Sequence, residues 1–373
     1  MKKMRRTTKV IPILLLALLL TVVPLAGIAC DDDDDEGGDG PFTFEMQAPY
    51  PETDASGIAL AAFQEIVEEK TDGRIKVNAS YNGQPIAHTA QFEALQTGAL
   101  DVAVQQPGYS REVDNNFDFS GALAGLIVSK AHYQAMLADD DYMDFQNNLY
   151  ETKNIKFLGI VDGYRFAGGY FTTFETDSLW DFEGHTIWSG RPGALEPYEA
   201  LLGCSDKVFF SQTELQGAIM GGQIDILAFP AILAYAYGLW QMPVLNDYLV
   251  RPFYAPYSIL MSLEDWEAMS GELQDIVMEE VMPAVQAEVT TKTLQGTKDA
   301  MKNLVDELGV DHVNVVPASE EEELYQQLVD YPAFTDRAAD MDQDIYELIK
   351  DLRPTPFTWS QEIQDIIEYA GLS

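Results

Sequence analysis

One unit of sequence occurs twice in this chain and constrains its fold more than any other feature. Residues 93–102 read as a short helix, a glycine at 98, an aspartate at 101 and an apolar strand. Residues 215–226 follow the same order, with a glycine at 222 and an aspartate at 225. Glycine commonly ends a helix, and a short apolar run is typical of a buried strand. Two copies of helix–Gly–x–x–Asp–strand predict two similar α/β lobes.

A second pair of similar segments also predicts two lobes. Residues 72–77 and 183–188 each place an apolar strand directly after a glycine. A chain of 373 residues also exceeds the roughly 250–300 residues at which a single core stops growing. A one-domain fold whose glycines match by coincidence remains the alternative.

Strands and helices alternate from residue 42 onward. The patterns predict strands at 42–46, 74–79, 100–104, 154–161 and 258–262. They predict helices at 56–70, 91–97, 262–308 with a kink at Pro283, and 320–352 with a break at Tyr331–Pro332.

The N-terminus reads as a secretion signal that is not part of the fold. Five cations and no acid precede residue 10, and residues 10–28 are apolar apart from Thr21. The run closes at Ala29–Cys30, which resembles a bacterial lipobox, although Gly27 stands where leucine is usual. We expect residues 1–29 to be a lipoprotein signal peptide and Cys30 to carry the lipid. A signal anchor or ordinary cleavage is the alternative.

An acidic segment follows the lipobox. Residues 30–40 hold six aspartates, one glutamate and three glycines, so like-charge repulsion predicts an extended, disordered tether. The second cysteine, Cys204, lies in an apolar context and is expected to be a small core residue rather than a nucleophile.

The charge of the chain excludes some functions. Its 61 acidic and 22 basic side chains give a net charge of −39. Such a body repels phosphate backbones, which excludes nucleic acid as a partner. An anionic membrane repels it too, so we expect membrane contact through a lipid anchor only. Hydrophobic residues at 47% are enough for a real core.

The sequence carries no signature of catalysis. Its four histidines lack metal-site spacing, and no P-loop, dinucleotide fingerprint or nucleophile elbow is present. We therefore expect no enzyme activity, no catalytic residue, no cofactor and no metal.

Two arginines stand out in a chain with so few cations. Arg165 and Arg191 each lie at a turn beside glycine, at the end of an apolar strand. Arginine suits bidentate recognition of a carboxylate. A structural salt bridge is the alternative for each.

These residues resemble a known family from about Phe42 to Leu308. The chain is similar to the DctP-like extracytoplasmic solute-binding subunits of tripartite ATP-independent periplasmic (TRAP) transporters. The resemblance rests on segments 63–77, 81–84, 95–101, 179–187, 216–225 and 262–266.

The resemblance implies a fold and a function. It implies an α/β, periplasmic-binding-protein-like clamp (type II-like), whose two lobes are joined by crossing strands and a long helix. Lobe I would comprise residues 41–162 plus about 253–285. Lobe II would comprise 163–252 plus about 286–373, with the C-terminal helices. Such a protein captures a small organic acid in an interlobe cleft, without catalysis, and delivers it to the membrane permease subunits of a TRAP transporter.

The expected binding site departs from the family pattern. Trp188 stands where many members have a ligand-gripping arginine, Arg165 matches a second family arginine, and Phe229 stands where asparagine is frequent. Arg191 lies three residues after Trp188, and whether it substitutes depends on the turn between them. We expect a mainly apolar or aromatic monocarboxylate, gripped by Arg165 and stacked on Trp188 and Phe229.

The first lobe is expected to contribute polar residues that follow its strands. Tyr50 follows the first strand, and Gln106 and Tyr109 follow the strand after Asp101. All three side chains carry groups that can donate a hydrogen bond to the ligand.

Two other functions stay open. One is a binding protein for an ABC permease or a sensor, and the other is a lipid-anchored hydrolase that uses two of the many carboxylates. In the leading interpretation the protein is extracytoplasmic and lipid-anchored, in the periplasm or on the outer face of the cytoplasmic membrane.

Overall fold

The computed structural model describes residues 37–117, 119, 130–164, 168–188, 196–205, 212–251, 255–353 and 361–372. The fold below is that of the compact unit formed by residues 36–373. Across the described residues, no helix has both the length and the apolar character needed to span a membrane.

The first sheet contains five strands in the order β2-β1-β3-β9-β4. Their bounds are β1 (Phe42–Gln47), β2 (Ile75–Ser80), β3 (Val102–Gln105), β4 (Ile155–Tyr164) and β9 (Ala255–Ser262). Strands β2, β1 and β3 run parallel, whereas β9 is antiparallel to both β3 and β4. The strands predicted from the sequence in this region are therefore confirmed.

The second sheet also contains five strands, in the order β10-β8-β5-β7-β6. Their bounds are β5 (Gly168–Thr172), β6 (Ile187–Trp188), β7 (Ile226–Ala228), β8 (Asp247–Arg251) and β10 (Val313–Val315). The edge pairs β6–β7 and β10–β8 are parallel, and β5 is antiparallel to both of its neighbours.

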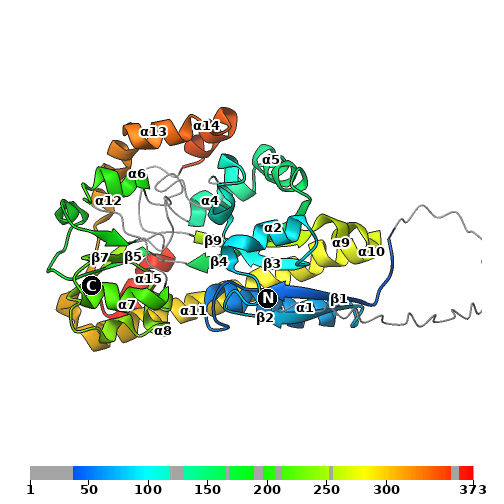
Figure 1. Cartoon of the computed structure of the whole chain (residues 1–373), viewed down its shortest axis with the longest axis horizontal. Coiled ribbons are helices and arrows are strands. Elements are labelled where there is room, and N and C mark those ends of the chain that lie inside the picture. The colour runs from blue at the N-terminus through cyan, green and yellow to red at the C-terminus, as the bar shows by residue number, and fades with distance from the viewer. Residues whose placement is uncertain are drawn as a thin grey trace, which may run out of the picture. The chain divides into compact units, whose positions relative to one another are not determined.

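Helices cover both sheets (Figure 1). They are α1 (Ala55–Lys70), α2 (Gln91–Gln96), α4 (Lys130–Leu137), α5 (Asp140–Glu151), α6 (Glu196–Leu201), α7 (Gln212–Met220), α8 (Ala231–Ala236), α9 (Leu263–Glu267), α10 (Gly271–Asp275), α11 (Met282–Leu308), α12 (Ala318–Leu328), α13 (Pro332–Ala338), α14 (Gln343–Asp351) and α15 (Gln361–Ala370).

Two predicted helices are divided into shorter pieces. The helix expected at 262–308 consists of α9, α10, a π-helical turn at Ile276–Val281 and α11, with Pro283 just after the π-helical turn. Proline has no N–H group to donate, and the π-helical turn just before Pro283 already departs from the regular α-helical hydrogen-bond pattern. The break expected at Tyr331–Pro332 separates α12 from α13 and is confirmed.

The repeated unit occupies equivalent positions in the two sheets. Gly98 and Gly222 adopt left-handed φ angles of 68° and 67° after their helices. Asp101 accepts a hydrogen bond of 2.7 Å from the backbone N–H of Glu45 at the neighbouring strand. Asp225 accepts one of 3.0 Å from the backbone N–H of Thr186, just before β6. Each aspartate therefore ties the start of its own strand to the adjacent one.

The second pair of similar segments is not structurally equivalent. The glycines at 73 and 184 both have left-handed φ angles. However, β2 follows the first glycine and pairs with β1, whereas β6 follows the second and pairs with β7, the strand of the repeated unit. The similarity reflects a shared turn before a strand and not a shared place in the sheet.

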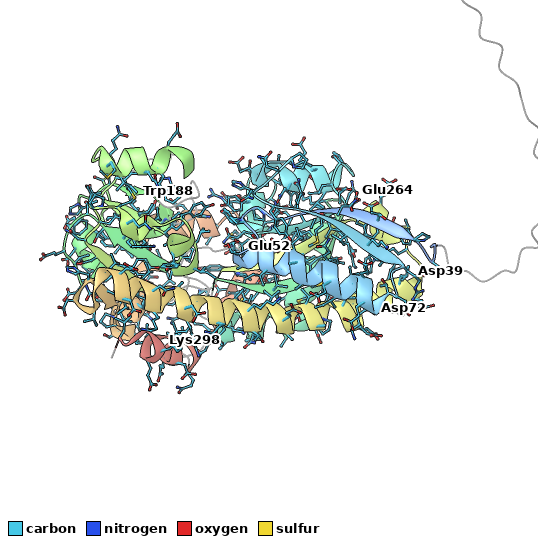
Figure 2. The ribbon with its side chains drawn as sticks, turned by 90° about the horizontal axis from the view of Figure 1, so that it is seen from below. Asp39, Glu52, Asp72, Trp188, Glu264 and Lys298 are labelled. Carbon is cyan, nitrogen blue, oxygen red and sulfur yellow. The ribbon has the colours of Figure 1, made fainter. Side chains whose placement is uncertain are left out.

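Along the described strands the chain passes between the two sheets three times, the last time from β9 through α11 to β10. Strand β4 of the first sheet precedes β5 of the second, and β8 of the second precedes β9 of the first. Helix α11 packs on α1 and β4 and also on α8, so it contacts both groups of strands (Figure 1). Figure 2 shows α11 running past α1 toward Lys298. The domain boundary expected near residue 285 falls inside this shared helix, so the boundaries stay a prediction.

Candidate functional site

Aromatic side chains gather where two strands of the second sheet end. Trp188 is the last residue of β6, and Phe229 directly follows β7. Their rings are stacked, with centroids 5.7 Å apart and planes 22° apart. Tyr237, just after α8, packs edge-on to Phe229 with centroids 5.9 Å apart. The two residues singled out in the sequence therefore form one stack, and they are buried to 3% and 4% exposure.

The position of Phe229 is set by its neighbours in the sheet. Its backbone N–H donates to the carbonyl of Gly169 at 2.8 Å, and its carbonyl accepts from the Tyr248 hydroxyl at 3.0 Å. A Cβ atom at residue 169 would lie 1.8 Å from that hydroxyl oxygen. Only glycine leaves room for Tyr248, so Gly169 fixes the backbone on which Phe229 stands.

The first lobe contributes a second aromatic group. The hydroxyls of Tyr50 and Tyr109 lie 3.2 Å apart and share a hydrogen bond. The His88 ring packs edge-on against Tyr109, with centroids 4.8 Å apart, and lies 6.3 Å from the Tyr50 ring. Tyr50 follows β1, His88 precedes α2 and Tyr109 follows β3, so the fold brings three separate segments together.

An electrostatic interaction connects the aromatic group of the second sheet with that of the first lobe. Burial raises the pKa of Tyr50 well above its usual value, and Tyr109, Asp54 and Tyr237 raise it further. Tyr237 is therefore close enough to interact with the Tyr50 hydroxyl, although the two residues belong to the two sides of the molecule. Burial also lowers the pKa of His88, which keeps its imidazole neutral at pH 7. Trp188 and Glu52, two residues after Tyr50, are labelled in Figure 2.

Four buried polar side chains belong to β1, α2, β3 and β9, in or beside the segments that carry the first-lobe group of Tyr50, His88 and Tyr109. Gln47, Gln91, Gln105 and Ser258 are each at most 2% exposed. Each has a side-chain N or O atom with no hydrogen-bond partner within the described part of the chain. None of these four residues was predicted from the sequence. The signal that could have identified some of them is a polar residue at the end of a buried strand. Gln106, which was predicted, is half-buried, and its carbonyl accepts from the Tyr109 N–H at 3.0 Å.

With this geometry established, comparisons with known proteins decide the family. The family of bacterial extracellular solute-binding proteins, family 7 (DctP), matches residues 46–330. The chain belongs to this family. A solute-binding protein from Sulfitobacter sp. (strain NAS-14.1) is 22% identical over 261 residues, which is 68% of this chain and 74% of that protein.

Solved structures of TRAP periplasmic solute-binding proteins share the fold. A TRAP periplasmic solute-binding protein from Roseobacter denitrificans with bound 3-deoxy-D-manno-oct-2-ulosonic acid has a TM-score of 0.71 at 18% identity. The match covers 84% of this chain and 99% of that one. One from Desulfovibrio salexigens with bound orotic acid has a TM-score of 0.71 at 15% identity, covering 87% and 99%. The predicted two-lobed α/β fold is confirmed.

Membership of the DctP family settles the general role. The chain is a bacterial extracellular solute-binding protein of this family. Three predicted residues, Arg165, Arg191 and Cys30, lie outside the described residues, so their roles stay predictions.

The other singled-out groups belong to the scaffold of this DctP protein. Cys204 is buried in the core, as expected. His185 stacks on Phe174 with centroids 3.9 Å apart. Within the described ranges, no three His, Cys, Asp or Glu side chains are grouped so that they could hold a metal ion.

Proposed function

We propose that this DctP protein captures a small organic acid between its lobes and hands it to the membrane subunits of a TRAP permease. The ligand is a mainly apolar or aromatic monocarboxylate. Its flat face lies against Trp188 and Phe229, and Arg165 grips its carboxylate. The observation that carries the proposal is the aromatic row of Trp188, Phe229 and Tyr237 at the strand ends of the second lobe. Its last member, Tyr237, is close enough to Tyr50 of the first lobe to raise the pKa of Tyr50.

The row suits a ligand with a flat face. Aromatic pairs contribute roughly 0.5–1.5 kcal/mol beyond the area they bury. The solved relatives named above hold an acidic sugar and an aromatic acid, so the fold accommodates ring acids of both kinds. Tyr50, Tyr109 and Gln106 complete the site from the first lobe.

A screen of organic acids by thermal shift tests the proposal. A ligand that binds only the folded state stabilises it by about 2.7 kcal/mol at a hundredfold excess over Kd. We expect a shift with at least one ring monocarboxylate and no turnover of it. A screen without any shift contradicts the proposal, and turnover of a glycoside by the purified chain supports the hydrolase alternative.

The variant Arg165→Ala tests the proposed contact between Arg165 and the carboxylate of the ligand. An arginine–carboxylate bond contributes about 1.5–3 kcal/mol, so the variant should bind at least tenfold more weakly by calorimetry. Arg74→Ala is the matched control, because Arg74 pairs with the exposed Glu272 at 2.9 Å. Equal affinities of the wild type and Arg165→Ala contradict the assignment.

We also propose that Cys30 is lipidated and holds the protein at the outer face of the membrane. Each buried CH₂ of the acyl chains contributes about 0.8 kcal/mol to that attachment. Labelling with a fatty-acid analogue should disappear in Cys30→Ser. Labelling that persists in this variant excludes Cys30 as the attachment site.

A further inference from the structure

Helices α13 and α14 connect the two lobes at a place apart from α11 and the crossing strands. They lie beyond residues 46–330, the part of the chain that matches the DctP family. In Figure 1 they lie on the opposite side of β4 and β9 from α11, with α6 and α12 at one end and α4 and α5 at the other. We name residues 332–351, which comprise both helices, the strap.

One end of the strap is bound to the second lobe. The hydroxyl of Tyr331, directly before α13, donates to the carbonyl of Ala200 in α6 at 3.3 Å, and α13 packs on α6. Helix α12, which leads into the strap, is held in the same lobe. The Glu320 carboxylate accepts from the Leu179 N–H at 2.6 Å and from the Ser178 hydroxyl at 3.0 Å. Both of these donors lie between β5 and β6 of the second sheet.

The other end of the strap is bound to the first lobe by two hydrogen bonds. The backbone N–H of Asp342, just before α14, donates to Oδ1 of Asn116 at 2.7 Å. The carbonyl of Ile349 in α14 bonds the ring Nε2 of His132 in α4 at 2.6 Å. A carbonyl only accepts, so this nitrogen carries the proton. His132 is fully buried, which shields its bond to the strap from water.

The residues that hold this end belong to the packed body of the first lobe. Phe117, the neighbour of Asn116, packs on Tyr150 of α5 with ring centroids 4.9 Å apart. Tyr150 in turn stacks on Phe157 of β4 at 5.3 Å. Helix α4, which carries His132, packs on α5. Both anchoring residues therefore move with the first sheet.

The strap is also braced internally. The rings of Phe334 in α13 and Tyr346 in α14 have centroids 6.5 Å apart. Arg353, two residues after α14, has a buried side chain that donates to Glu322 of α12 at 2.8 Å. Its guanidinium also lies 3.4 Å from the centre of the Tyr325 ring. Charge-assisted bonds of this kind are the stronger ones, so both ends of the strap are held to α12 as one body.

We propose that the strap limits how far the two lobes separate. Crossing strands and a shared helix let two lobes turn about the place where they are joined. The strap joins the same lobes on the other side of β4 and β9, so a wider opening requires the loss of its bonds to Asn116 and His132. These two bonds are the weakest part of the connection, because the second-lobe end also includes α12. The inference concerns the lobes alone and does not depend on which ligand is bound.

Pulsed electron resonance between one spin label in each lobe tests the inference on the full chain. The labels replace Glu93, exposed on α2, and Met220, which is 53% exposed on α7, in a Cys30→Ser, Cys204→Ala background. We expect Asn116→Ala with His132→Phe to add a population with a longer distance between the labels. Glu347→Gln is the matched control, because its carboxylate pairs with Lys350 on an exposed face of α14, and it should leave the distances unchanged.

Hydrogen exchange of the same variants shows whether the strap was released. The amides of α14 should exchange faster in the double variant and in Asn116→Ala alone, a change at a half-buried residue that keeps the buried histidine in place. Faster exchange with unchanged label distances overturns the inference, because a released strap then does not affect the lobes. Unchanged exchange overturns it too, because Asn116 and His132 then do not hold α14.

Release of the opposite end separates a strap from a general loss of stability. Glu320→Ala removes the acceptor of the Ser178 and Leu179 bonds and should lengthen the label distance in the same way. Combined with the double variant it should lengthen the distance no further, because a strap released at one end no longer restrains the lobes. Additive lengthening by the two releases overturns the inference.

Discussion

Asp162 in β4 and Lys130 at the start of α4 form an ion pair with 2.9 Å between the carboxylate and the ammonium group. The Asp162 side chain is only 6% exposed. The same carboxylate accepts a hydrogen bond from the Thr290 hydroxyl in α11. One buried carboxylate therefore joins the strand that leads toward the second sheet, a first-lobe helix and the helix that contacts both lobes.

Asp162→Asn should lower the free energy of unfolding by about 1–3 kcal/mol, because it removes the buried negative charge that pairs with Lys130 and accepts from Thr290. Denaturant unfolding measures this change. Asp306→Asn is the control, since Asp306 pairs with Lys302 on an exposed helix face and should cost no more than about 0.5 kcal/mol. Equal losses in the two variants contradict a structural role for the Asp162 junction.

Gly169→Ala should destabilise the second sheet through overpacking. The new Cβ would meet the Tyr248 ring and hydroxyl at 1.8–2.4 Å, and a displaced Tyr248 would release the Phe229 carbonyl. We expect a loss of about 1–3 kcal/mol in the free energy of unfolding. Gly217→Ala in α7 is the control, since no atom lies within 4 Å of its Cβ position. Alanine there should stabilise the helix by about 0.5–1 kcal/mol. A tolerated Gly169→Ala contradicts the packing argument.

Local patterns in the sequence predicted much of this fold. The repeated glycine and aspartate signals identified α2–β3 and α7–β7 because left-handed glycines and strand-starting aspartates depend on neighbouring residues. The order of strands in each sheet was not predictable in this way. It depends on pairings between distant segments, such as β9 with β3 and β4, which no local pattern encodes.

The candidate site was likewise predictable only where it depends on local sequence. Trp188 and Phe229 were found because they depart from a family motif, and their stacking follows from the adjacent strands β6 and β7. Gln91 was missed because its burial depends on how α2 packs across β3 and β9. His88 was noticed as one of four histidines, but only the fold places its ring against Tyr109.

His312 gives the protein a pH-dependent contribution to stability. Its ring bonds Asp247 at 2.8 Å, and this hydrogen bond, with Asp311 and Glu175 nearby, raises the pKa of His312. The folded state therefore holds the proton more tightly than the unfolded state, where the pKa of histidine is about 6.5. The added stability is fully present below that pH and is lost as the pH rises through the folded pKa.

The variant His312→Gln should accordingly lose more stability at pH 5.5 than at pH 9. Denaturant unfolding of the wild type and the variant at both pH values measures the difference. Asp247→Asn should remove the same pH-dependent part, because Asp247 is the group that favours the proton. A deficit of equal size at both pH values would show that the ion pair makes no contribution.

Tyr50→Phe tests the first-lobe half of the site. The raised pKa of Tyr50 keeps its hydroxyl protonated at neutral and mildly alkaline pH, so it remains a hydrogen-bonding group where the protein works. Removing one such hydrogen bond costs about 0.5–1.5 kcal/mol, so affinity for an acid found by thermal shift should fall about twofold to tenfold. Because Tyr50 and Tyr109 bond each other, Tyr50→Phe and Tyr109→Phe should be non-additive in a double-mutant cycle. Tyr369→Phe, which removes an exposed hydroxyl bonded to Asp299, is the control and should leave affinity unchanged. Additive effects, or an unchanged affinity in Tyr50→Phe, would exclude this hydroxyl pair from the site.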